Sequence, residues 1–296
     1  MASSCSSSTS ARSVDEQATA ATRLWGDRGR AVSTPDPAAL AATESGVALT
    51  MDRASYVTYL PGVHLSVLEP RTSAVPHVVA RTHDSFVATV SAWWTVDHRE
   101  QLIWTLFRAD KTGGRYRISV VFDRPDGPFP ASSDVVHLGR LSSAGRTLVA
   151  DVGAFRQYTR AHGTLPPWLA FVDNRLTTGY VDAVKTHKTP ESWEVSTEST
   201  KIAASTNTSG FSIPLDGGVL SCGVLETTGT IRHRAGEPIR PEPVLGDEGF
   251  RVADGLYDSF TEIDEESVCV RHGGTGRPEV VSVISIPTVV TGTPAR

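Results

Sequence analysis

Apolar and polar residues alternate along the middle of the chain, which is the pattern of half-buried β-strands. In the segment FVATVSAWWTV, Phe86, Ala88 and Val90 fall on one side of the expected strand and Thr89 falls on the other. The clearest hairpin follows at 102–122, where LIWTLFRA and RYRISVVF flank the turn sequence DKTGG.

Similar strand signals recur along most of the remaining chain, without a long helical period. Further strands are expected at 47–60, 63–69, 135–141, 146–152, 168–174, 180–186, 193–204, 211–215, 219–225, 228–234, 250–253, 267–271 and 279–290. A helical turn is expected at 153–162. No internal repeat is visible. The pattern predicts an all-β protein built as a sandwich or barrel with long loops.

The N-terminal part has a different character. Residues 1–13 are rich in serine, and a short helix is expected at 14–25, ended by Gly26 and Gly29. Residues 33–46 resemble a linker. We therefore expect residues 1–45 to form a flexible, extended N-terminal arm and residues 46–296 to form a single β-sandwich domain.

Composition narrows the possible partners. The 296 residues include 39% apolar and 21% charged residues, and the formal net charge is −5. Such a charge argues against a general binder of nucleic acid or anionic membranes, which would need clustered Lys and Arg. The local group Arg23, Arg28 and Arg30 is partly offset by nearby acidic residues.

Neither the start of the chain nor its cysteines carry a recognised signal. The first residues lack a secretory or myristoylation pattern, and no apolar run is long enough to span a membrane. Cys5, Cys222 and Cys269 show no metal-binding spacing. Cys222 and Cys269 are expected to be buried thiols in a reducing compartment, with a disulfide between them as the alternative.

No motif points to catalysis, so we predict a protein that is not an enzyme and holds no cofactor or metal. His77 and His83 could share a strand face, but exposed histidines at strand ends are the simpler interpretation. The acidic stretch 254–266 predicts a solvated loop, with a divalent ion between subunits as the sharper alternative. Dispersed carboxylates for glycoside hydrolysis stay open, because their pairing is spatial.

Tryptophans supply the candidate contacts. Adjacent Trp93 and Trp94 in one strand must point to opposite faces, so one of them is expected in the core and the other on a surface. In the N-terminal arm, Arg23 and Trp25 are the further interface candidates. Exposed aromatic residues of this kind would serve equally for a protein partner, a sugar or a base.

The hairpin stretch 102–122 resembles the mid-domain strand pair of picorna-like virus capsid proteins. Phe107-Arg108, Gly113-Gly114 and the run Arg115-Tyr116-Arg117-Ile118 carry the likeness, while Asp110-Lys111-Thr112 departs from the tighter join of that family. The resemblance covers about 20 of the 296 residues.

The resemblance implies an antiparallel β-sandwich of jelly-roll type and a structural subunit of an icosahedral virus shell. Its partners would be copies of itself and related capsid subunits, with encapsidated nucleic acid bound only indirectly. The location implied is a virion assembled in the host cytoplasm. The alternative is a ligand-binding or carbohydrate-binding β module that uses exposed tryptophans, and a hydrolase is the third possibility.

Overall fold

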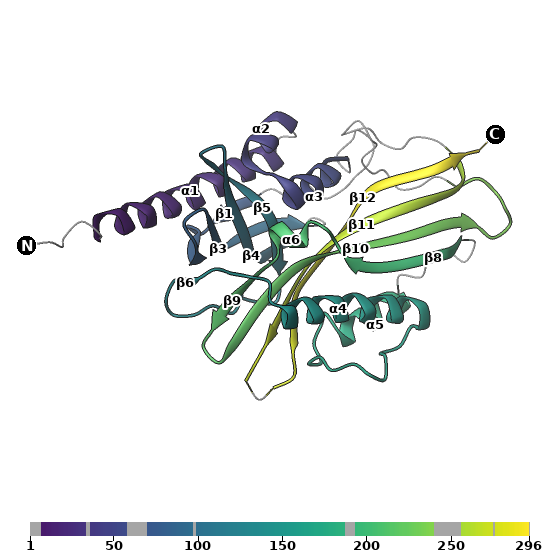
Figure 1. The fold of residues 1–296 in the computed structure, drawn as a ribbon. Helices are drawn as coiled ribbons and strands as arrows, with labels where there is room; N and C mark the ends of the chain where they lie inside the picture. The colour runs from purple at the N-terminus through teal and green to yellow at the C-terminus, as the bar shows by residue number, and fades with distance from the viewer. Residues whose placement is uncertain are drawn as a thin grey trace, which may run out of the picture. The chain divides into compact units, whose positions relative to one another are not determined.

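The protein is mostly β in composition, with two sheets rich in antiparallel pairs (Figure 1). The computed structural model describes residues 7–33, 36–57, 70–96, 99–186, 193–239, 256–274 and 276–295. Strands account for 44% of the structure and helices for 30%, so the helical content exceeds the all-β expectation.

The chain divides into two compact units. Unit 1 comprises Met1–Leu49, Ser66–Leu138 and Ile213–Asp216, and unit 2 comprises Thr50–Leu65, Gly139–Ser212 and Gly217–Arg296. The two units are described separately below.

Unit 1 joins helices to a sheet with strand order β5-β4-β3-β2-β6. Strands β1 and β2 both pair with β3, β2 with its first half and β1 with its second half. Together they occupy the place of a single long strand that is interrupted in the middle. The expected hairpin at 102–122 is confirmed as β4 and β5. The elements are α1 (Ser7–Ser33), α2 (Pro37–Thr43), the start of α3 (Gly46–Val57), β1 (Pro70–Ser73), β2 (His77–Arg81), β3 (Ser85–Val96), β4 (Arg99–Thr112), β5 (Arg115–Arg124) and β6 (Val136–His137).

Helix α1 corrects the prediction of a flexible arm. Its described part continues through Gly26 and Gly29, which were expected to end a shorter helix. Ala21, Leu24 and Trp25 are buried in one cluster with residues of β3, β4 and β5. Burial of this stripe offsets the cost of about 1 kcal/mol that each glycine imposes on a helix.

The strand expected at 47–60 is wrong, because residues Gly46–Val57 form α3. Val47, Met51 and Ala54 are buried at spacings of four and three residues, which is a helical period. The expected strand at 63–69 lies outside the described residues.

Unit 2 places helices against a second sheet, with strand order β12-β11-β10-β9-β7. Strand β8 pairs with the second half of β10, and helix α6 separates β8 from β9. The elements are the remainder of α3 (Gly46–Val57), β7 (Gly139–Arg140), α4 (Ser143–His162), α5 (Thr178–Thr186), β8 (Trp193–Ile202), α6 (Thr206–Ser209), the start of β9 (Phe211–Leu215), β10 (Gly218–His233), β11 (Tyr257–His272) and β12 (Glu279–Pro294).

Helix α4 corrects a second group of strand predictions. The strand expected at 146–152 and the helical turn expected at 153–162 both belong to this single helix, which Ser142 caps at its start and Gly163 ends in a left-handed conformation with φ 66°. The strand expected at 180–186 is helix α5, and 168–174 forms neither helix nor strand.

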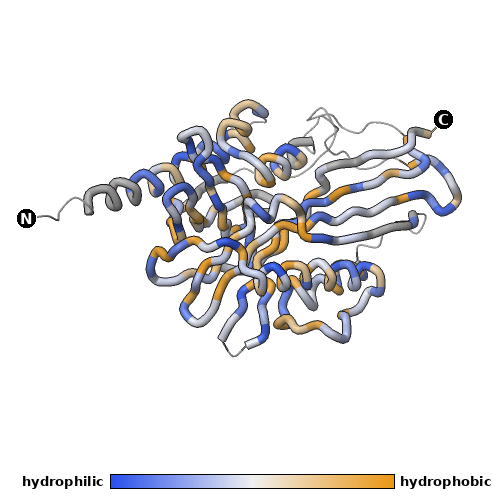
Figure 2. Tube along the Cα trace, in the orientation of Figure 1, coloured by the Kyte–Doolittle hydropathy of each residue, from blue (hydrophilic) through white to orange (hydrophobic). Residues whose placement is uncertain are grey.

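The later strand predictions agree better with the structure. Those at 193–204 and 211–215 correspond to β8 and β9, and two separate predictions merge into the long strand β10. Those at 267–271 and 279–290 lie in β11 and β12, whereas 250–253 is outside the described residues. Figure 2 shows that apolar residues gather in the first half of β10 and the second half of β11, which pair with each other.

The core of unit 2 lies between α4 and this apolar part of the sheet. Val149 and Val152 of α4 pack in one buried cluster with Leu225 of β10 and Val268 of β11. Cys222 and Cys269 are directly opposite on β10 and β11 and form a disulfide. The expectation of two free thiols is therefore wrong, and its alternative, a disulfide, is confirmed.

Candidate binding surfaces

Trp93 lies on an open part of the unit 1 sheet. It is 43% exposed, whereas Ala92, its neighbour in the chain, belongs to the core that packs on α1. Strand pairing places Leu102 of β4 opposite Trp93, and Trp104 follows two residues later on the same face. Leu102 and Trp104 are both half-buried. We call Trp93, Leu102 and Trp104 the tryptophan face.

The tryptophan face continues into a buried region along the same strands. Val87 and Leu106, which share the sheet face with Trp93, have almost no exposed surface. Arg124 of β5 pairs with Trp104, is half-buried, and donates a hydrogen bond to the carbonyl of Pro128 at 3.0 Å. A partly exposed apolar surface with a cation at its edge is typical of a contact surface.

The other predicted contact residues have different surroundings. Trp25 is only 5% exposed and stacks on Phe107 with ring centroids 5.7 Å apart, so it is a core residue of this chain. Trp94 is not among the residues whose side chains the structure describes. Arg23 is exposed on α1 and lines a pocket.

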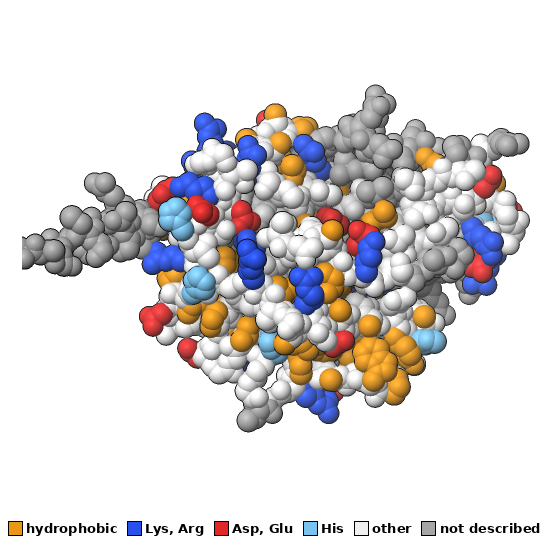
Figure 3. Space-filling view, in the orientation of Figure 1, with side chains coloured by type: hydrophobic (Ala, Val, Ile, Leu, Met, Phe, Trp, Pro, Cys, Tyr) orange, Lys and Arg blue, Asp and Glu red, His pale blue; other side chains and the backbone are white. Residues whose placement is uncertain are grey.

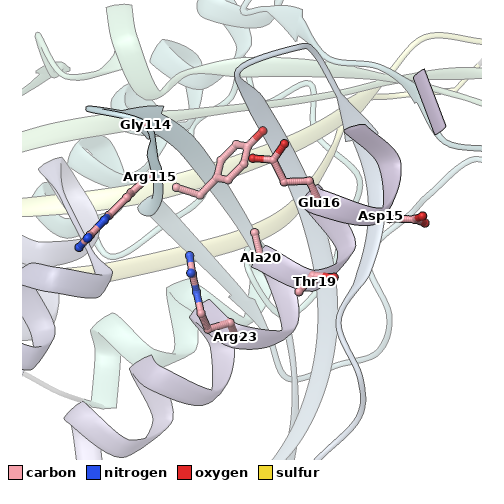
Figure 4. A pocket seen from close by; sticks show the side chains of 8 residues that line it. Asp15, Glu16, Thr19, Ala20, Arg23, Gly114 and Arg115 are labelled. Atoms are coloured by element: carbon pink, nitrogen blue, oxygen red, sulfur yellow. The ribbon is translucent and has the colours of Figure 1, made fainter. Parts of the chain in front are cut away.

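That pocket lies between α1 and the turn that joins β4 to β5 (Figure 4). It has a volume of about 390 Å³ and is lined by Asp15, Glu16, Thr19, Ala20, Arg23, Gly114, Arg115 and Tyr116. Figure 4 shows Arg23 and Arg115 on one side of the pocket and the two acidic residues on the other. We call it the α1 pocket.

One wall of the α1 pocket is fixed by hydrogen bonds. The Tyr116 hydroxyl accepts from Gln17 Nε2 and donates to the His83 carbonyl, both at 3.3 Å. Lys111 lies 5.2 Å from the centre of the Tyr116 ring and donates to Glu16 at 2.9 Å. The hydrogen bond to Glu16 raises the pKa of Lys111, so the lysine carries its charge over the neutral range.

Unit 2 contains a buried cluster of charged residues. Glu266 is 1% exposed, and its Oε1 accepts from Arg160 at 2.9 Å and from Thr227 at 3.2 Å. Its Oε2 lies 2.7 Å from Arg156 Nε, close enough for an ion pair but not aligned for a hydrogen bond. Burial acts to raise the pKa of Glu266, but the charges of Arg156 and Arg160 outweigh it and the pKa is lowered.

Tyr180 completes this cluster from α5. Its hydroxyl accepts from Arg160 Nε at 2.7 Å, and the Arg156 guanidinium lies 4.1 Å from the centre of its ring. Each charged group is thus engaged by groups of the same unit, which is the arrangement of a structural ion-pair network.

The preceding residue, Glu265, is in the opposite electrostatic situation. Burial, with a smaller contribution from the charge of Glu226, raises its pKa to about 7. Glu226 lies directly across from it on β10 and is itself paired with Lys201 at 2.7 Å. The prediction of a solvated loop is therefore wrong for the described part of the acidic stretch, which belongs to strand β11. Glu265 lies on the opposite face of this strand from Asp264 and Glu266.

A serine and a histidine meet near the start of α4. Ser221 Oγ lies 2.8 Å from His272 Nε2 and 3.2 Å from Ser212 Oγ, and burial lowers the pKa of His272. This is the distance of a nucleophile and its base. Ser221 is nevertheless fully buried, so a substrate cannot approach its hydroxyl in this conformation and we assign the pair a structural role.

Exposed apolar side chains also gather over the α4–α5 segment of unit 2 (Figure 3). Trp168 is 50% exposed and Val172 is 38% exposed. Tyr158 contacts Trp168 edge-on, with ring centroids 6.4 Å apart, and packs on His162. Sequence reasoning missed Trp168 because 168–174 was predicted to be a strand, although the preceding Pro166-Pro167 favours a surface loop.

The surroundings of the two candidate histidines are also visible. His77 and His83 are exposed, and His83 bonds to Asp84 at 2.8 Å, as the simpler interpretation predicted. In the part of the chain that the structure describes, no group of three or more metal-binding side chains occurs. Among the same residues, no helix combines the length and apolar character needed to cross a membrane. The sequence matches no protein-family model and no curated protein.

Proposed function

We propose that the protein is an assembly protein that associates with further copies of itself through the tryptophan face of unit 1. The observation that carries the proposal is the 43% exposure of Trp93 beside half-buried Leu102 and Trp104. Partly exposed tryptophans in an apolar setting are the residues that most often dominate binding energy at protein interfaces.

The finer form of this proposal is a structural subunit of an icosahedral virus shell, located in the virion. Its support is the resemblance of residues 102–122 to capsid proteins. The long strands of each sheet pair with their neighbours in sequence, as in meanders, whereas a jelly roll contains two Greek keys. The shell role therefore rests on the resemblance and on the tryptophan face, and not on strand order.

The proposal is tested by sedimentation velocity over a wide concentration range, with negative-stain electron microscopy of the concentrated sample. We expect reversible self-association, weakened at least about tenfold by Trp93→Ala. Val135→Ala is the matched control, because Val135 is 42% exposed in the same unit but lies outside the tryptophan face. Closed particles of uniform size would support the shell role.

Three outcomes contradict the proposal. A chain that stays monomeric at all concentrations has no such assembly function. Loss of association in Trp168→Ala, and not in Trp93→Ala, would move the interface to unit 2. A monomer whose tryptophan fluorescence is quenched by a glycan, with the effect lost in Trp93→Ala, would favour the carbohydrate-binding alternative.

A further inference from the structure

The α1 pocket contains two cations that have no carboxylate partner. Among the described residues, neither Arg23 nor Arg115 forms an ion pair or a side-chain hydrogen bond, and both side chains are exposed. Two guanidinium groups that line one cavity repel each other, and a bound anion would relieve this repulsion.

The other cation beside the pocket is already neutralised. Lys111 is paired with Glu16, so the two charges cancel locally. Asp15 is the one other acidic residue among those that line the pocket. The net formal charge of Arg23, Arg115 and Asp15 is therefore positive. The positive charge is concentrated on the side of the pocket where Figure 4 shows the two arginines.

The pocket has walls that would hold a small ligand in one place. Tyr116 is 4% exposed and is anchored by Gln17 and the His83 carbonyl, so its ring is a fixed surface. Gly114, with φ +78°, lies at the rim, where a Cβ would meet no atom within 4 Å. The rim is thus open to solvent, and the volume of about 390 Å³ is within the usual range for small-molecule sites.

We infer that the α1 pocket binds a small ligand through one oxyanion group, a carboxylate or a phosphate, held between Arg23 and Arg115. Guanidinium groups suit both because their parallel N–H bonds match two oxygens of such a group. Asp15 disfavours a second negative charge at the other side, so the rest of the ligand is neutral or positively charged. This inference is independent of the assembly role.

The test is a titration of the full chain with inorganic phosphate and, separately, with acetate, observed through the backbone amide signals of Gly113, Gly114 and Arg115. Sodium chloride at matched ionic strength is the control for general salt effects. We expect saturable shifts with phosphate, acetate or both, and none with chloride. The anion with the higher affinity identifies the group that the site prefers.

Variants on the two sides of the pocket should change the affinity in opposite directions. Arg23→Gln and Arg115→Gln should each weaken binding about tenfold, and the double variant should abolish it. Asp15→Asn should tighten binding several-fold, because it removes a negative charge from the pocket. Arg277→Gln is the matched control, since Arg277 is an exposed arginine of unit 2.

Several results would overturn the inference. They are the absence of saturable shifts with either anion, equal shifts with chloride, unchanged affinity in the double variant, or an equal loss in Arg277→Gln. The Asp15→Asn result adds a check that does not depend on losing a signal, because unchanged or weaker anion binding in that variant contradicts the charge argument.

Discussion

Units 1 and 2 follow the same order of elements but use polar residues differently. Each has a long helix, an interrupted strand beside the first long strand, and three long antiparallel strands joined in sequence. In unit 1 the helix contacts an aromatic core, and two arginines that have no partner among the described residues line a surface pocket. In unit 2 two arginines of α4, Arg156 and Arg160, pair with the buried Glu266.

This difference shows that the order of elements does not determine where charge is placed. The sheet face under α1 carries Phe86, Phe107 and Tyr116. The face under α4 carries the buried carboxylate of Glu266, and two arginines of α4 neutralise its charge. We therefore expect the stability of unit 1 to depend on the packing of its aromatic core, and the stability of unit 2 to depend in part on the balance of its buried charges.

The largest expected effect is the loss of an aromatic residue from the core of unit 1. Trp25→Ala should lower the free energy of unfolding by about 3–5 kcal/mol, because it removes the stack on Phe107 and leaves a cavity. Hydrogen exchange resolved by peptide measures this as faster exchange in β3–β5. Trp93→Ala, at an exposed position, should change the free energy of unfolding by less than about 1 kcal/mol. Equal effects would contradict the assignment of Trp25 to the core.

A comparable effect is expected when the charge balance of unit 2 is broken. Glu266→Gln leaves Arg156 and Arg160 without their carboxylate and should cost about 3–5 kcal/mol. Exchange should then increase in α4 and β10–β12 while unit 1 is unaffected. Glu237→Gln is the control, because Glu237 is exposed. An unchanged unit 2 would mean that the network is not required for stability.

A smaller effect, dependent on pH, is expected at Glu265. Its folded pKa of about 7 exceeds its ordinary value of 4.5, so folding favours the protonated form. The resulting stability is fully present below about pH 4.5 and is lost as the pH rises through 7. Glu265→Gln should therefore be more stable than the wild type at pH 8, by up to about 3 kcal/mol, and equal to it near pH 4.

Urea unfolding of both proteins at several pH values measures this difference. Glu266 does not contribute to this difference, because both proteins contain it and its pKa in the folded state is lowered, not raised. A difference between Glu265→Gln and the wild type that does not depend on pH would contradict the assignment.

The smallest pair of effects compares one glycine in each long helix. A Cβ on Gly153 of α4 would lie 2.8 Å from Thr200 Cγ2, whereas the nearest atom to one on Gly26 of α1 is Arg30 Nη1 at 3.7 Å. Gly153→Ala should destabilise by about 1–3 kcal/mol and Gly26→Ala should stabilise by about 0.5–1 kcal/mol. Thermal unfolding compares the signs, and the same sign for both would contradict the difference in packing.

Local sequence determined the parts of the fold in which strand period and turn chemistry agree. The hairpin β4–β5 follows from alternation on both sides of Gly113-Gly114, whose φ values of 59° and 78° a two-residue turn requires. Strands β8, β9 and β12 were predictable for the same reason. Helices α3 and α4 were not, because short apolar stretches such as Leu148-Val149 fit both a strand and a helix.

Only tertiary structure decided which polar and aromatic residues are available for binding. Glu265 and Glu266 are adjacent and chemically identical, yet one lies across from a carboxylate and the other faces two arginines. Trp25 and Trp93 differ in the same way, since α1 buries one and the sheet exposes the other. The physical reason is that burial and pairing depend on residues distant in the chain, which no local period records.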